Sequence, residues 1–238
     1  MEPAETIRNA VATVGLLRVQ TAASPDLSEA VRQIKLFQAR RFRATYADLL
    51  SSNDYGPATQ FFLEELYSDR DYVKRDAQFA KIAGALQTLF PKQVVQTAVT
   101  LAQLHRLTEE LDHQMGLAVL SGTCADPASS YRQAWGTVGR RNDRDLQLKT
   151  VLSVGLELER LTRAPGLRMM LKMMRRPAHA AGLGALQSFL EAGFDTFAAM
   201  SGKKELVANF LAVIEERERK LIHALFTPGT AQIDQYLQ

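Results

Sequence analysis

The placement of proline is the feature that most constrains how this chain can fold. The fixed φ angle and missing N–H of proline suit the first turn of a helix and damage a helix interior. Ser24 and Asp126, which precede two of the prolines, are good helix N-cap residues. The spacing therefore predicts helices that begin near six prolines: Pro25, Pro57, Pro91, Pro127, Pro165 and Pro177.

Apolar residues between these prolines repeat at helical spacing, and no run alternates convincingly at period two. In the segment 25–50, Leu27 and Ile34 belong to an apolar stripe, and Arg32 and Lys35 are expected on a solvated face. The predicted helices cover about 4–20, 25–50, 57–67, 70–90, 91–120, 127–139, 143–163, 165–175, 177–200 and 203–226.

This pattern predicts an all-α fold: a single compact multi-helix bundle of about nine or ten helices. The length of 238 residues suits one domain, expected over residues 1–226, with two closely packed halves as the alternative. Residues 227–238, which include Pro228 and Gly229, are expected to form a loose C-terminal tail.

Charge and composition narrow the function classes. The 29 basic and 26 acidic residues give a formal net charge of +3, which is too close to balance to favour nucleic-acid binding. No apolar run approaches the roughly 18 residues of a membrane span, so no stable membrane insertion is expected. The single cysteine, Cys124, and the lack of a signal-like N-terminus favour a cytoplasmic protein.

One predicted helix carries a candidate metal site. His105, Glu109 and His113 lie four residues apart on one face, and Glu110 stands three residues before His113. The Glu-x-x-His spacing occurs in di-iron carboxylate bundles, although such bundles need a second copy, which this chain lacks. The alternative is a solvated or ion-paired helix face.

The segment from Phe61 to Tyr67 crowds aromatic residues against acids. In the structural interpretation, the apolar side chains fill a core and the acids face nearby cations. In the functional interpretation, Glu64 or Glu65 lines a polar-ligand pocket with Arg75 and an aspartate, Asp71 or Asp76. The predicted ligand-binding residues are Glu64, Glu65, Tyr67, Arg75, Arg140 and His179.

Arg140 and His179 belong to this set for different reasons. Arg140 opens a charged run that can grip a phosphate or carboxylate, unless the neighbouring aspartates neutralise it. His179 lies close to the glycine-rich stretch 180–185, where a flat ligand such as haem can approach the backbone, unless it is a surface or capping group. Close helix packing is the preferred explanation for the glycines there and for Gly193.

The segment Leu167–Arg176 concentrates four methionines among cations. Methionine at helical spacing fills a core well, and this is the preferred interpretation. The alternatives are the wall of a ligand pocket, or a face that binds a membrane or a partner protein.

The residues Phe61-Phe62-Leu63-Glu64-Glu65-Leu66-Tyr67 resemble the signature of a bacterial family called FFLEELY-motif proteins. The resemblance extends to Leu107–Asp112, Val138–Arg140, Arg176–Ala178, Ala181–Leu183 and Leu186-Gln187. It implies membership of a family of uncharacterised bacterial proteins and no particular activity.

Two function classes remain open. The first is a helical protein that binds an apolar or amphipathic small molecule or a protein partner. The alternative is a metal- or haem-dependent enzyme of ferritin-like or haem-oxygenase-like architecture, built on His105, Glu109 or Glu110, and His113. No phosphate-binding loop, dinucleotide fingerprint or nucleophile elbow is present in the sequence, and neither a cofactor nor a catalytic residue can be named.

Overall fold

The computed structural model describes residues 1–66, 72–122, 124, 126–202 and 205–227, which form helices and no strands, so the all-α prediction is confirmed. The helices are α1 (Pro3–Ala22), α2 (Pro25–Thr45), α3 (Ala47–Leu50), α4 (Gly56–Leu66), α5 (Val73–Leu89), α6 (Lys92–Ser121), α7 (Pro127–Val138), α8 (Arg141–Thr162), α9 (Leu167–Met173), α10 (Arg175–Ala180), α11 (Gly184–Ser201) and α12 (Leu206–Phe226). Tyr67 and residues 228–238 of the predicted tail lie outside the described residues.

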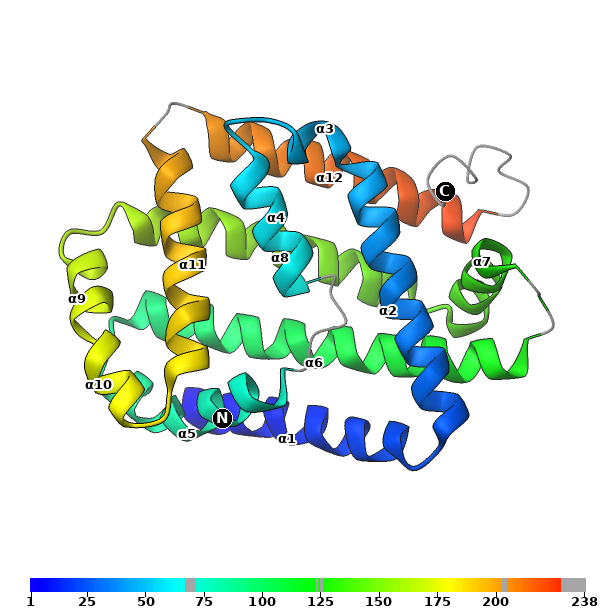
Figure 1. Cartoon of the computed structure of the whole chain (residues 1–238), viewed down its shortest axis with the longest axis horizontal. Coiled ribbons are helices and arrows are strands. Elements are labelled where there is room, and N and C mark those ends of the chain that lie inside the picture. Colours follow the sequence, from blue (N-terminus) through cyan, green and yellow to red (C-terminus); the bar gives the residue numbers. More distant parts are fainter. Residues whose placement is uncertain (67–71, 123, 125, 203–204, 228–238) are drawn as a thin grey trace.

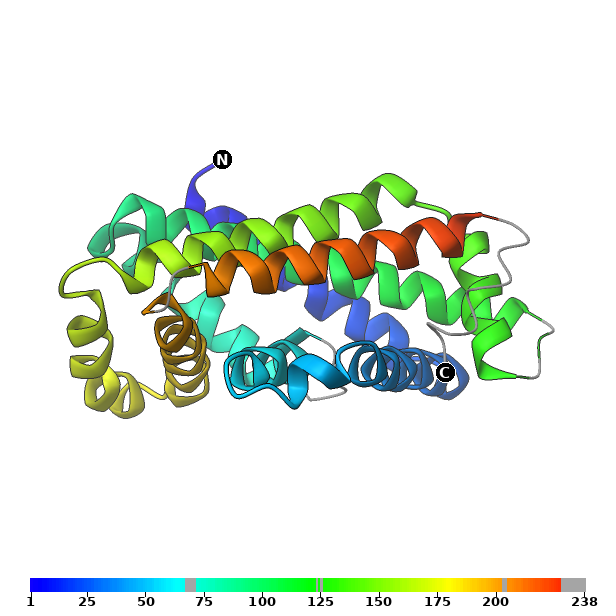
Figure 2. The ribbon, with the colours of Figure 1, turned by 90° about the horizontal axis from the view of Figure 1, so that it is seen from above.

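The long helices form two crossing layers. Helices α1, α6, α8 and α12 run along the long axis of the molecule, while α2, α4 and α11 cross them on one face (Figures 1 and 2). Helix α7 lies at one end, and α9 and α10 lie at the other (Figure 1). Helix α6 is central, because it contacts α1, α2, α5, α7 and α8. No described helix combines the length and apolar character needed to cross a bilayer.

Three clusters of buried apolar side chains hold these layers together. One lies among α2, α6, α7 and α12 around Met115 and Trp135. A second joins α2, α4, α11 and α12 around Phe62 and Phe210. The third lies among α1, α5 and α6 around Ile7. Phe62 belongs to the aromatic segment, so the interpretation of that segment as core is confirmed at this position.

The predicted helix starts are confirmed where an N-cap residue precedes proline. Ser24 Oγ accepts a hydrogen bond from the Leu27 amide at 3.3 Å, and Asp126 Oδ1 accepts one from the Ser129 amide at 2.9 Å. These bonds satisfy amides that have no partner within the first turn.

The predicted helix over 25–50 is wrong in one respect, because it breaks at Tyr46. Tyr46 is fully buried, and its hydroxyl donates to Glu218 Oε1 of α12 at 2.9 Å. The helix therefore ends where the Tyr46 side chain makes this contact with α12, and α3 begins at the next residue, Ala47.

The predicted helix over 177–200 is also interrupted. Gly182 has φ +75°, a left-handed conformation that favours glycine, and it lies between α10 and α11. Close helix packing is therefore the wrong explanation at this glycine. At Gly193 it is the right one, because a Cβ there would lie 3.1 Å from the Phe61 ring.

The methionine-rich segment does not fill the core, contrary to the preferred interpretation. Met169 is 66% exposed, Met173 is 70% exposed and Met174 is 39% exposed. No residue of α9 is buried, because this short helix lies at the end of the molecule, where few elements are available to cover it (Figure 1).

Candidate functional site

Charged side chains from α1, α2, α5 and α6 meet inside the bundle. Lys35 Nζ donates to both carboxylate oxygens of Glu109, at 2.9 and 3.0 Å. Asp76 Oδ2 lies 2.9 Å from Arg18 Nη2 and 2.9 Å from His105 Nε2. Arg18 Nη2 also lies 3.7 Å from Glu109, which joins the two groups into one buried charge network.

The partners in this network determine the pKa values of its carboxyl groups. Burial acts to raise the pKa of Asp76, but His105, Arg75 and Arg18 together hold it below its ordinary value. Burial likewise opposes the ionisation of Glu109, and Lys35 is the main reason that its pKa is nonetheless lowered.

Asp112 behaves in the opposite way. Its side chain is buried beside the network and accepts a hydrogen bond from the neutral amide Gln38 Nε2 at 3.0 Å. Burial raises its pKa, because the nearby positive charge of Lys35 does not compensate for the loss of solvent.

Arg75 connects the network to α4. Its Nη1 donates to Glu65 Oε2 at 2.7 Å, and its Nε lies 3.6 Å from Asp76 Oδ1. The guanidinium carbon lies 3.9 Å from the centre of the Tyr72 ring and 4.9 Å from that of Phe189. Two aromatic faces and two carboxylates therefore fix this guanidinium in one position.

Glu65 also lines an apolar cavity of about 70 Å³ between α4, α6, α8 and α11. Among the described residues that line it, Glu65 is the one charged side chain. The remaining lining residues are Phe61, Phe62, Leu101, Leu104, Val151, Val154, Gly155, Leu158, Phe189, Leu190 and Gly193. The site is thus an apolar cavity that Glu65 helps to line, and Arg75 binds the carboxylate of Glu65.

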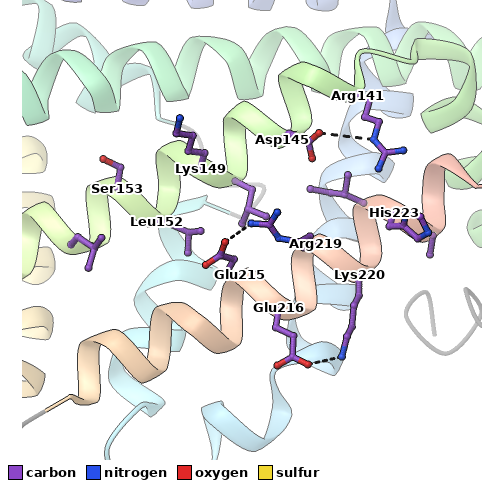
Figure 3. A pocket seen from close by; sticks show the side chains of 14 residues that line it. Arg141, Asp145, Lys149, Leu152, Ser153, Glu215, Glu216, Arg219, Lys220 and His223 are labelled. Atoms are coloured by element: carbon purple, nitrogen blue, oxygen red, sulfur yellow. Dashed lines mark hydrogen bonds and ion pairs between the residues drawn. The ribbon is translucent and has the colours of Figure 1, made fainter.

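A larger groove, of about 1300 Å³, lies between α8 and α12 (Figure 3). Leu152 and Leu156 contribute apolar surface. Three ion pairs run along its helices: Arg141 with Asp145 at 4.0 Å, Glu215 with Arg219, and Glu216 with Lys220 (Figure 3). Lys149 also lines the groove and takes part in no ion pair with the residues that the structure describes. Because the side chains of these three pairs are exposed to solvent, which screens their charges, the pairs select no particular ligand charge. This groove was not predicted from the sequence, although the leucines of α8 extend beyond a single stripe.

The residues predicted as metal ligands take part in three separate contacts. His105 and Glu109 belong to the charge network. Glu110 accepts a hydrogen bond from Arg106 Nη1 at 2.8 Å, and His113 Nδ1 lies 2.8 Å from Thr21 Oγ1. In the part of the chain that the structure describes, no group of three or more His, Cys, Asp or Glu side chains is placed to hold a metal ion.

The predicted ligand-binding residues are only partly brought together. Glu65 and Arg75 form an ion pair, as described above. Glu64 accepts a hydrogen bond from Gln60 and is not among the residues that line the cavity. Arg140 lies elsewhere, bonded to Asp143 at 2.6 Å and to Gln114 at 3.2 Å, and His179 is exposed on α10.

The partial burial of two cations was not predicted from the sequence. Lys35 was expected on a solvated face, but its side chain is 21% exposed, and that of Arg18 is 26% exposed. The sequence feature that could have indicated this partial burial is a long cationic side chain at the edge of an apolar stripe, because its charged end can reach a buried carboxylate.

These features define an all-α protein in which a buried charge network adjoins a small apolar cavity. The chain belongs to a family described as a domain of unknown function (DUF8198), whose model matches residues 17–232. No curated protein and no solved structure shows a significant match to it.

Proposed function

We propose that the protein binds a small amphipathic molecule, with its apolar chain in the cavity and its polar end at Glu65. The observation that carries this proposal is the position of Glu65, the one charged residue among the described residues that line this apolar cavity. Ligand sites commonly combine an apolar lining with a few polar groups that fix orientation.

The chemistry of Glu65 defines the polar end of the ligand. An ionised carboxylate donates no hydrogen bond and can accept several, and that of Glu65 accepts one from Arg75. A ligand with an ammonium or hydroxyl end can donate to the carboxylate. A carboxylate ligand would bring a second negative charge against it and is expected to be excluded.

The volume of the cavity defines the apolar end. A cavity of roughly 150 Å³ holds a benzene ring, so about 70 Å³ accommodates roughly three carbon atoms without rearrangement. The ligand class is therefore a short-chain primary amine or alcohol.

We further propose that the segment resembling the FFLEELY signature forms the ligand-facing helix of this family, and that the protein is cytoplasmic and bacterial.

A chain-length series tests the cavity. Affinity for n-alkylamines and n-alkanols is expected to rise by about fourfold per methylene, the equivalent of about 0.8 kcal/mol, and to level off at about three carbons, when the cavity is full. Binding is measured by NMR titration of labelled leucine and valine methyl groups.

Val154→Leu tests the position of the ligand. The added methylene occupies part of the cavity and is expected to weaken n-butylamine binding by at least about fourfold. Leu156→Ala is the control, because Leu156 lies on the same helix and is 45% exposed outside this cavity. Equal affinity in the wild type and Val154→Leu, or a rise in affinity that continues with chain length, would contradict the proposal.

A further inference from the structure

The exposed side of α9 and α10 combines apolar and cationic side chains in a way that neither packing nor the cavity explains. It consists of Met169, Lys172, Met173, Met174 and Arg176, which we call the methionine–cation face. All five side chains are exposed, and helices α9 and α10 lie at one end of the molecule (Figures 1 and 2).

The segment that carries this face has charges of one sign only. Residues 167–181 contain four cations and no acid. Two of the cations are neutralised by α11, since Arg168 pairs with Asp195 at 3.0 Å and Arg175 with Glu191 at 2.7 Å. Within the described ranges, Lys172 and Arg176 take part in no ion pair. The methionine–cation face therefore presents two cations beside three exposed thioethers.

We propose that the methionine–cation face docks an acidic segment of a partner protein that also carries apolar side chains. Carboxylates of the segment pair with Lys172 and Arg176, and its apolar side chains cover the methionines. Methionine suits this contact because its flexible, polarisable side chain adapts to an incoming surface. Complementary charge supplies orientation and selects against basic partners.

A protein segment fits this face better than a membrane surface does. Stable binding of a helix to a bilayer depends on a large buried apolar area together with a cluster of cations. Here α9 and α10 have seven and six residues, and α11 neutralises half of the cations. Two such short helices with two available charges favour a focused, transient protein contact.

Methionine methyl NMR on the full chain provides the test. The probe is a synthetic amphipathic helix with glutamates on one face and leucines on the other, and its control carries lysine in place of each glutamate. The acidic peptide is expected to shift the ε-methyl signals of Met169, Met173 and Met174 and to leave those of Met115 and Met200 unchanged. The latter two are 0% and 2% exposed and serve as internal controls.

Two pairs of surface substitutions separate the contributions. Lys172→Glu with Arg176→Glu is expected to weaken binding of the acidic peptide by at least about tenfold, and Met169→Gln with Met173→Gln by about fivefold. The proposal is overturned if the acidic peptide shifts none of the three signals, or if the charge-reversal variant binds it with unchanged affinity. It is also overturned if vesicles of anionic and zwitterionic phospholipid shift these signals and the peptide does not.

Discussion

Glu218→Gln is expected to lower the free energy of unfolding by about 3–5 kcal/mol. Glu218 is 7% exposed and accepts hydrogen bonds from Arg41 Nη1 and the Tyr46 hydroxyl, which joins α2 to α12. Glutamine preserves the shape of the side chain but removes the charge that compensates the buried guanidinium, and burying a charge without its partner is costly. Urea unfolding followed by circular dichroism measures the loss.

Glu216→Gln is the matched control for this substitution. Glu216 lies on the same helix and pairs with Lys220, but both side chains are exposed to solvent. Exposed ion pairs contribute little, so the urea midpoint of Glu216→Gln is expected to match that of the wild type. A similar loss of stability in both variants would mean that the buried pair with Arg41 is not the cause.

Glu109→Gln is expected to lower the free energy of unfolding at neutral pH by about 2–3 kcal/mol. The substitution removes the carboxylate that holds Lys35, and the value lies below the range for a fully buried pair because the Lys35 side chain is 21% exposed. The pKa of Glu109 is lowered in the folded state, so its contribution is present above its ordinary value of 4.5 and is lost as the pH falls through the folded value. The difference between the two proteins should therefore shrink in acid.

Asp112→Asn removes a buried carboxyl group whose charge is not fully compensated, so its effect on stability is expected to be opposite to that of Glu109→Gln. Burial raises the pKa of Asp112, so the charged form opposes folding at neutral pH, and asparagine retains an oxygen for Gln38. Asp112→Asn is expected to equal or exceed the wild type in urea at pH 7. If Asp112→Asn lowered the free energy of unfolding as much as Glu109→Gln does, the inference that the buried charge of Asp112 opposes folding would be contradicted.

The helices could be predicted from the sequence because the signals that produce them are local. Ser24 and Asp126 cap helices with their own side chains, and proline restricts the first turn independently of distant residues. The break at Tyr46 could not be predicted in this way, because it accompanies a bond to Glu218, which lies 172 residues away in the sequence.

The candidate site was partly predictable for a similar reason. Glu65 belongs to the heptapeptide Phe61–Tyr67, and Arg75 was predicted from the sequence as a cationic partner. The burial of Lys35 and Arg18 depends on where α1 and α2 lie against α6, which helical periodicity does not specify. The exposure of the methionines could not be predicted either. Apolar side chains at helical spacing give the same sequence pattern in a core helix and in a helix at an uncovered end of a bundle.

The central claim, that Glu65 selects the ligand, is tested most directly by comparing n-butylamine with butanoate. The wild type is expected to bind the amine at least about tenfold more tightly, and Glu65→Gln should abolish this preference. Glu64→Gln is the control, since Glu64 is adjacent in the sequence and does not line the cavity. A preference for butanoate, or an amine preference that survives Glu65→Gln, would contradict the account.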